Sequence, residues 1–206
     1  MSATAAAKKA LREEVRRAIA ALSDAEKRRQ SALVTEQVLA RPEWAAARSV
    51  ALFLSLRDEP CTRALLEAAL ASGRDVFAPR VLRADPPPPL MAMLRVRSAA
   101  DAQRMPAGAL GVREPPADAD DALRSGGPDL VLVPGVAFAA AGGRRLGRGR
   151  GFYDEWLREC RAERARRGLP PPATLALAFR QQLFEHVPCE PHDAVVDAVI
   201  AAPDLP

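Results

Sequence analysis

Residues 129–157 read DLVLVPGVAFAAAGGRRLGRGRGFYDEWL, and they place an apolar strand, a loop rich in glycine and arginine, and a helix in succession. The run 129–133 is typical of a buried strand, and Pro134-Gly135 closes it. The spacing from Phe152 onward predicts a helix to about Arg167. Strand, loop and helix in this order are a common phosphate-binding arrangement in α/β proteins.

The loop alternates small and cationic residues. Glycine lets backbone N–H groups approach an anion without a Cβ atom in the way, and arginine adds forked, charge-assisted hydrogen bonds. The glycines are Gly147, Gly149 and Gly151, and the arginines are Arg145, Arg148 and Arg150. Asp154, on the first turn of the predicted helix, could bind the magnesium that accompanies a nucleoside triphosphate. The loop lacks both the Walker A and the GxGxxG spacing, and alone it also fits a solvated loop, an RGG-like patch or a turn.

Size and composition predict one domain over residues 1–206. The chain has 206 residues, of which 49% are hydrophobic, and it has no run long enough to predict a membrane span. The net charge is +4, with arginine clustered at 144–167, which favours an anionic partner. Only 4% of residues are aromatic, so stacking platforms for nucleic acid are few. We expect a monomer that binds small phosphorylated ligands rather than nucleic acid or membrane.

The cysteines fit a reducing compartment, because three widely spaced thiols form neither a disulfide framework nor a zinc motif. They are Cys61, Cys160 and Cys189. The basic, alanine-rich stretch 1–22 has some transit-peptide character, but Glu13 and Glu14 interrupt it. We therefore expect a mature helix and a cytoplasmic protein, with organelle import left open.

Strand and helix patterns alternate along the chain. Helices are predicted at 5–22, 23–39, 62–71 and 152–167, and strands at 49–54, 75–79, 91–96, 129–133, 174–178 and 194–201. Ser23 and Glu26 form a predicted capping box, and the prolines at 85–89 predict an exposed extended loop. The segment 99–125, which contains Glu114-Pro115-Pro116, is polar and turn-rich. The alternation predicts a mainly parallel α/β sheet with helices on both faces.

The stretch 129–157 closely resembles the signature of the 5-formyltetrahydrofolate cyclo-ligase family, also called methenyltetrahydrofolate synthetases. Other similar stretches are KKALR at 8–12, FLSLRDEPCT at 53–62, residues 75–80, TLALAFRQ at 174–181, His-Asp at 192–193 and Val-Val-Asp at 195–197. The resemblance spans residues 8 to 200. It implies a single Rossmann-like domain of the ribose-phosphate isomerase and CoA-transferase type.

The resemblance also implies a reaction. ATP and Mg²⁺ would drive the cyclisation of 5-formyltetrahydrofolate to 5,10-methenyltetrahydrofolate, with release of ADP and phosphate. The formyl oxygen would attack the γ-phosphate, and N10 would then displace phosphate from the imidate intermediate. Such a reaction needs positioning and charge stabilisation more than a protein nucleophile.

Site residues follow by position from the same resemblance. Implied ATP-binding residues are Lys8, Lys9, Arg12, Arg145, Leu146, Gly147, Arg148, Gly149, Arg150, Gly151, Phe152 and Tyr153. Implied folate-binding residues are Phe53, Leu54, Glu59, Arg148 and Phe152. Arg148 and Tyr153 would lie nearest the reaction as catalytic residues, and Asp154 and Asp193 would hold Mg²⁺. Glu59 would accept hydrogen bonds from the pterin's amide and amino edge.

Two segments depart from the family pattern. Ala139 stands where relatives usually have an aspartate, and the following loop, 140–144, is one residue longer. The region 107–110 lacks an aromatic residue that could stack on the folate. These departures keep two alternatives open: an RNA-binding relative without catalytic activity, and a kinase or ligase that acts on another small acid.

Overall fold

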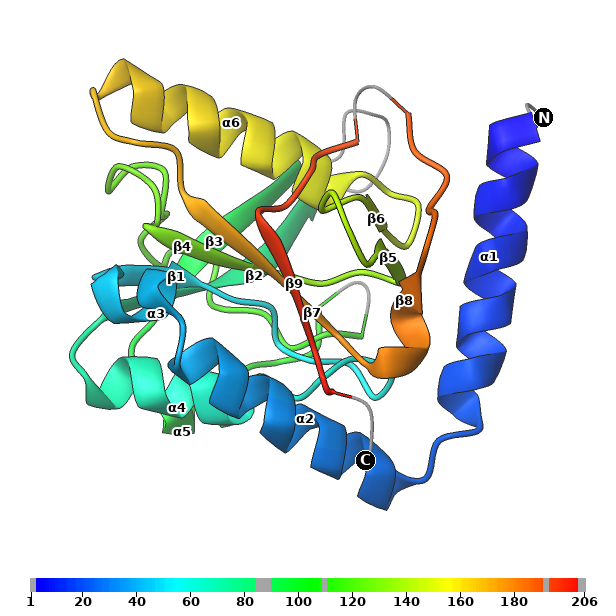
Figure 1. Ribbon diagram of the computed structural model, residues 1–206. Coiled ribbons are helices and arrows are strands. Elements are labelled where there is room, and N and C mark those ends of the chain that lie inside the picture. The colour runs from blue at the N-terminus through cyan, green and yellow to red at the C-terminus, as the bar shows by residue number, and fades with distance from the viewer. Residues whose placement is uncertain (1–2, 84–89, 109–110, 191–192, 204–206) are drawn as a thin grey trace.

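A computed structural model describes residues 3–83, 90–108, 111–190 and 193–203, and Figure 1 shows a central sheet between layers of helices. The strand order is β3-β2-β1-β4-β7-β9, and neighbours are parallel except β2 and β3, which form an antiparallel hairpin. The strands are β1 Ser49–Ala51, β2 Asp75–Arg83, β3 Leu90–Val96, β4 Leu130–Val133, β7 Ala173–Ala178 and β9 Ala198–Ala201. The predicted mainly parallel α/β sheet is confirmed.

Helices cover both faces of this sheet (Figure 1). One face packs against α6, and the other packs against α2, α3 and α4. The helices are α1 Ala3–Ala20, α2 Asp24–Leu39, α3 Pro42–Ala46, α4 Arg63–Ala71, α5 Ala99–Arg104 and α6 Phe152–Arg166, with a 3₁₀ turn at Arg180–Gln182. Because α4 and α6 each connect two parallel strands, they are the crossovers that such strands require. Among the described residues, no helix is long and apolar enough to cross a membrane.

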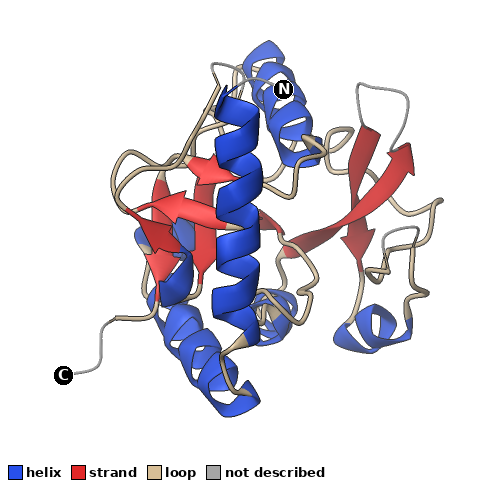
Figure 2. Cartoon of the chain, turned by 90° about the vertical axis from the view of Figure 1, so that its right-hand side faces the viewer, coloured by secondary structure: helices blue, strands red, loops and turns tan. Residues whose placement is uncertain are grey.

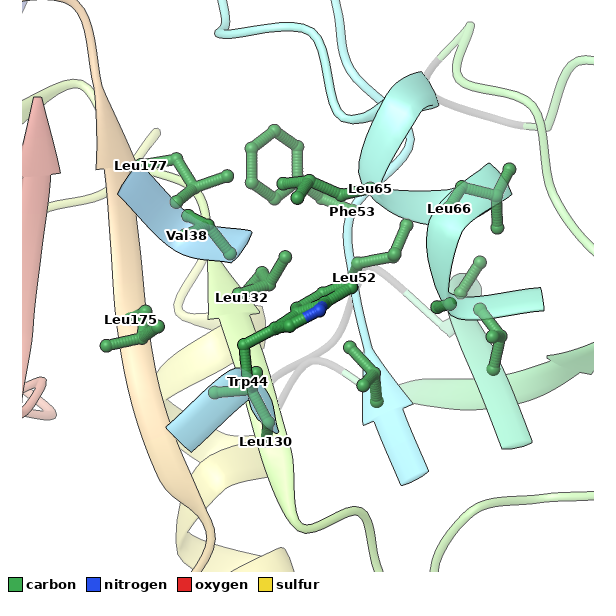
Figure 3. Packing of buried hydrophobic residues seen from close by; sticks show 14 of the residues in the cluster. Val38, Trp44, Leu52, Phe53, Leu65, Leu66, Leu130, Leu132, Leu175 and Leu177 are labelled. Atoms are coloured by element: carbon green, nitrogen blue, oxygen red, sulfur yellow. The ribbon is translucent and has the colours of Figure 1, made fainter. Parts of the chain in front are cut away.

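Strand β4 contributes to the hydrophobic clusters on both faces of the main sheet. Leu130 and Leu132 pack with Trp44 under α2, α3 and α4 (Figure 3). Val131 and Val133 belong to the cluster beneath α6. Successive side chains of a strand point to opposite faces, so an unbroken apolar run is what a doubly covered strand needs. Burial of each such side chain stabilises the fold by about 1.5–3 kcal/mol.

A second, three-stranded sheet carries the loop between Ala139 and Gly151. Its order is β6-β5-β8, with β5 antiparallel to β6 and parallel to β8. Its strands are β5 Ala137–Ala139, β6 Arg145–Leu146 and β8 Leu183–Phe184. Helix α1 packs on this sheet through Val15 and Ile19, and Figure 2 shows α1 running along that side of the molecule. The N-terminal helix therefore lies beside the Gly/Arg loop.

Several sequence-based boundaries were wrong. The strand predicted at 49–54 ends at Ala51, because Phe53 and Leu54 leave the sheet to line a cavity. The strand predicted at 194–201 begins only at Ala198, and the N–H of Val196 instead donates to the carbonyl of Gly143 at 3.0 Å. Helices α3 and α5 and the small sheet were not predicted. The proline loop 85–89 lies outside the described residues.

The predicted start of α2 is confirmed, but only half of the capping box forms. Ser23 Oγ accepts a hydrogen bond from the Glu26 N–H at 3.1 Å, which satisfies one exposed donor of the first turn. The Glu26 carboxylate binds Arg29 and Gln30 on its own helix. A cationic partner one turn away thus replaces the reciprocal backbone contact.

Candidate active site

An apolar cavity of about 350 Å³ opens where the carboxyl ends of β1, β2 and β4 meet the Gly/Arg loop. Phe53 and Leu54 line it after β1, and Val81 and Met91 line it from the β2–β3 hairpin. Loops that leave the carboxyl ends of parallel strands converge at one edge of a sheet, which is the usual ligand site in this class of fold. The sheet topology thus brings distant parts of the sequence around one space.

Glu59 places a carboxylate in the wall of this cavity. It is 9% exposed, and its Oε2 accepts a hydrogen bond from the Leu56 N–H at 3.0 Å. Burial raises the pKa of Glu59, and the contacts with Leu56 and Arg148 offset this only in part. A carboxylate held beside apolar surface in this way suits the N–H donors of a heterocycle.

Arg148 joins the Gly/Arg loop to the same acidic turn. Its Nη2 lies 2.7 Å from Asp58 Oδ1 and 3.2 Å from Glu59 Oε1. The side chain is about half exposed, so this contact lies at the accessible rim of the cavity. The guanidinium therefore closes the space between the loop and the turn after β1.

The hydroxyl group of Tyr153 is buried in the cavity wall. Within the described part of the chain it makes no hydrogen bond. Burial raises the pKa of Tyr153, and the nearby charge of Glu59 adds to the effect, so the phenol stays protonated at neutral pH. A buried donor without an acceptor is costly, and a ligand oxygen placed there would recover that cost.

A larger groove of about 960 Å³ lies on the other side of the loop. It is lined by α1, the Gly/Arg loop, the first turns of α6 and residues 190 and 193–195. Five residues line both the groove and the cavity: Arg145, Gly147, Arg150, Gly151 and Asp154. The loop is thus the partition between an apolar space and a charged one.

Asp154 lies in the first turn of α6, as predicted. Its Oδ1 accepts hydrogen bonds from Arg145 Nη2 at 2.8 Å and from the Ala194 N–H at 2.9 Å. Among the described residues, no hydrogen bond reaches Oδ2. The carboxylate therefore ties together the loop, α6 and the C-terminal segment, while one of its oxygens remains available to a ligand.

Helix α1 contributes two cations to the groove. Lys8 Nζ lies 2.7 Å from Asp193 Oδ2 and 2.8 Å from Glu190 Oε2, and Arg12 Nε donates to the Gly147 carbonyl at 2.8 Å. Burial lowers the pKa of Lys8, but the hydrogen bonds and charges of both carboxylates outweigh it and leave the pKa raised. Lys8 is therefore protonated at neutral pH, and its ion pairs with Glu190 and Asp193 hold α1 against the other side of the groove.

Two glycines of the loop have backbones that other residues rarely adopt. Gly149 has φ +99°, and Gly151, which precedes α6, has φ +72°. Both values lie in the left-handed region, where a Cβ atom causes strain. The alternating glycines thus allow a tight turn into the helix, beside Arg12, whose guanidinium approaches Gly149.

The structure brings nearly all residues implied by the sequence to these two spaces. Those that line the cavity are Phe53, Leu54, Glu59, Arg148, Phe152 and Tyr153. Those that line the groove are Lys8, Arg12, Arg145, Leu146, Gly147, Gly149, Arg150, Gly151, Asp154 and Asp193. Lys9 is not brought there: it is exposed and lines neither space, because adjacent helical residues point in directions about 100° apart.

Glu114 is a cavity residue that the sequence did not reveal. It is 5% exposed and lines the same cavity as Glu59. A glutamate before two prolines reads as part of a turn, and no spacing links it to a strand 33 residues earlier along the chain. Only the tertiary fold brings it to the site.

The loop 140–144, which departs from the family pattern, is held by backbone hydrogen bonds. The Ala139 N–H donates to the Arg144 carbonyl at 2.8 Å, and the Gly143 carbonyl accepts from Val196. Ala139 itself is buried in the cluster that packs against α1. The aromatic position sought near 107–110 falls in part on residues 109–110, which lie outside the described residues.

An apolar cavity and a charged groove beside the strand ends of an α/β sheet are typical of proteins that bind a ligand at that edge. The sequence profile of the 5-formyltetrahydrofolate cyclo-ligase family matches residues 4–202. The 5-formyltetrahydrofolate cyclo-ligase of Mus musculus is 33% identical over 196 residues, which are 94% of this chain and 93% of the mouse protein. The chain belongs to the 5-formyltetrahydrofolate cyclo-ligase family and is an enzyme.

Solved structures agree with this assignment. A 5,10-methenyltetrahydrofolate synthetase of Aquifex aeolicus superposes with a TM-score of 0.73 and 28% identity, covering 94% of this chain and 88% of the other. A 5,10-methenyltetrahydrofolate synthetase of Mycoplasma pneumoniae gives a TM-score of 0.68 at 18% identity, covering 95% and 99%, which supports the fold alone.

Proposed function

We propose that the protein converts 5-formyltetrahydrofolate to 5,10-methenyltetrahydrofolate with consumption of ATP in the presence of Mg²⁺. Family membership supports the folate reaction. The observation that carries the proposal further is the loop 145–154, which lines both the apolar cavity and the charged groove. A phosphoryl transfer between two substrates needs such a shared wall, because the two reacting groups must meet.

The cavity is the proposed folate site. Phe53 and Leu54 supply apolar surface, and the buried carboxylate of Glu59 supplies an acceptor for pterin N–H groups. This acceptor is in contact with Arg148. Folate binding would therefore exchange one partner of Glu59 for another and free the guanidinium of Arg148 for the reacting groups.

The groove is the proposed site for the ATP phosphates. Lys8, Arg12 and Arg145 bring positive charge to it, and the glycines keep its floor open to backbone contacts. Lys8 is paired with Asp193, and Arg145 with Asp154. Phosphate binding would draw these cations from their carboxylates.

The same two carboxylates fit Mg²⁺. Asp154 Oδ2 carries no hydrogen bond from the described residues, and Asp193 lies next to Ala194, whose N–H binds Asp154 Oδ1. Two carboxylates are the protein share that magnesium usually takes beside phosphates and water. When bound, the ion would neutralise charge on the phosphates.

The proposed chemistry makes and breaks two bonds in sequence. The formyl oxygen attacks the γ-phosphorus and ADP leaves; N10 then attacks the formyl carbon, loses its proton, and phosphate leaves. Arg148 and Tyr153, which line the cavity, are placed to stabilise the developing charge. Because its pKa is raised, the Tyr153 hydroxyl remains a donor to the formyl or phosphoryl oxygen.

The arrangement of charge favours this enzyme over an RNA-binding relative. Several arginines that could contact a nucleic-acid backbone are paired with carboxylates of their own helix, as in Arg158 with Glu155 and Arg166 with Glu163.

We further propose that the protein is a monomer and that it acts in the cytoplasm. The free cysteines at 61, 160 and 189 fit a reducing compartment.

One assay tests the proposal. Purified protein is mixed with 5-formyltetrahydrofolate, ATP and Mg²⁺, and formation of the methenyl chromophore is followed by absorbance, with omission of each component as control. Turnover that requires all three is expected. Absence of turnover by folded protein would refute the proposed activity, and steeply salt-dependent RNA binding in its place would support the alternative.

A further inference from the structure

A second buried carboxylate lies in the wall of the folate cavity. Glu114 is 5% exposed and comes from the segment after α5, far along the chain from Glu59. Charged side chains are rarely buried unless they are paired and hydrogen-bonded. The partners of Glu114 therefore indicate what the residue does.

Those partners lie on strand β2. Glu114 Oε1 accepts a hydrogen bond from the Val81 N–H at 3.1 Å, and Oε2 lies 3.8 Å from Arg80 Nη1. The same Arg80 nitrogen donates to the Pro115 carbonyl at 2.7 Å. The segment that contains Glu114 is thus attached to β2 by a backbone donor and by one guanidinium.

The attachment falls where the hairpin is irregular. The β2–β3 register shifts between Val81 and Arg83, so the ladder is interrupted at this end of the strand. Val81 and its cross-strand partner Met91 both line the cavity. Glu114 therefore supplies the acceptor for the Val81 N–H at the last regular pair before the irregularity, and so fixes the backbone of this part of the wall.

Gly108 packs closely against the Glu114 carboxylate. A Cβ atom added to Gly108 would lie 2.1 Å from Glu114 Cδ. The Gly108 N–H also donates to the Val112 carbonyl at 2.7 Å, and the Glu114 N–H donates to the Pro106 carbonyl at 3.1 Å, so the backbones of both residues are held by hydrogen bonds. The position of the Glu114 carboxylate is therefore set by backbone on both sides.

We propose that Glu114 is a positioning residue for the folate substrate, which acts by holding Val81 and the hairpin wall in the shape that receives the ligand. This inference rests on the proposed function, because it assigns the cavity to folate. Its effect is confined to the cavity, since Glu114 and its partners do not line the groove.

The test compares Glu114→Ala with Glu114→Gln. The amide oxygen of glutamine can still accept from Val81, whereas alanine cannot. Equilibrium binding of 5-formyltetrahydrofolate is measured by calorimetry without ATP, and KM values for folate and ATP are measured by the chromophore assay. We expect Glu114→Ala to weaken folate binding about tenfold and to leave the KM for ATP within about twofold. Glu114→Gln is expected to bind folate within about threefold of wild type.

A second variant, Gly108→Ala, tests the same part of the cavity wall, because its added Cβ atom would displace the Glu114 carboxylate without removing it. It should weaken folate binding like Glu114→Ala, and the double variant should be no worse than Glu114→Ala alone, because the clash is then gone. Glu67→Gln, on the exposed face of α4, is the matched control and should change nothing. Circular dichroism and thermal unfolding report whether each variant is folded.

The outcomes separate the two proposals. Wild-type protein that binds folate but does not turn over would count against the proposed activity, while the binding comparison would still decide the role of Glu114. Unchanged binding by Glu114→Ala would overturn that role. Equal losses in the Gln and Ala variants would do so as well, because they would indicate direct contact between the charge and the ligand. No folate binding by the wild type would overturn both.

Discussion

The cavity and the groove share the loop 145–154 but differ in how their charged side chains are stabilised. In the cavity, the carboxylate of Glu59 is buried among apolar groups and its pKa is raised. In the groove, the charges of Lys8 and Asp154 are satisfied by ion pairs. One side is therefore poised to gain hydrogen bonds from a neutral heterocycle, and the other to exchange one set of ionic partners for another.

The largest expected effect falls on Asp154, one of the residues that line both spaces. Asp154→Asn keeps an acceptor for Arg145 and Ala194 but loses the charge that would bind Mg²⁺. We expect kcat to fall about 10³-fold at saturating substrates. Circular dichroism should show an unchanged fold, and near-normal magnesium-dependent turnover would contradict the metal assignment. Asp154→Ala is less informative, because it leaves the buried Arg145 without its partner.

A substitution in the cavity should affect only the folate. Glu59→Gln keeps the shape of the side chain but loses its negative charge, so we expect the KM for 5-formyltetrahydrofolate to rise about thirtyfold. The KM for ATP should remain close to that of wild type. A parallel rise in both constants, measured in the same assay, would show that the two spaces are not independent.

The converse substitution should affect only the nucleotide. Lys8→Met removes the cation that α1 brings to Asp193 and Glu190, and we expect the KM for ATP to rise about tenfold. Lys9→Met is the matched control, because Lys9 is exposed and lines neither space. Equal effects of the two substitutions would argue that only the net charge of α1 matters.

The smallest effect is on stability as a function of pH. Because the pKa of Glu59 is raised from 4.5, the folded chain binds more protons at this site than the unfolded chain over the interval above that value. The free energy of unfolding therefore falls as pH rises through the interval. Relative to wild type, Glu59→Gln should gain stability over the same interval, as measured by urea unfolding at several pH values. A stability of Glu59→Gln that, relative to wild type, increases as the pH is lowered would contradict the raised pKa of Glu59.

The sequence predicted the parts of the fold in which one pattern has one structural solution. The run at Leu130–Val133 is apolar at every position, and it forms a strand that is covered on both faces, which buries all of it. The small sheet could not be predicted, because β6 and β8 have two residues each and show no periodicity. Both pair with β5, and the partner of β8 lies far away in the sequence, since Phe138 pairs with Leu183.

For the site, the sequence predicted which residues assemble but not how they pair. The loop chemistry and the family resemblance identified Lys8, Arg148 and Asp154. Their partners depend on the tertiary fold: Lys8 meets Asp193 across 185 positions, and Arg148 meets Glu59 across 89. Glu114 could not be identified, since its role depends on a strand irregularity that leaves no mark on composition or spacing.

The hydrogen bond from Ala194 to Asp154 gives the protein an internal reporter. The Ala194 nitrogen lies 2.9 Å from Asp154 Oδ1, the oxygen that also accepts from Arg145. The chemical shift of the Ala194 amide therefore depends on the charge of that carboxylate. In a ¹⁵N-labelled sample, one amide resonance would register any change in the partners of Asp154. A metal titration could then be followed at a single backbone nitrogen, independently of turnover and of the folate.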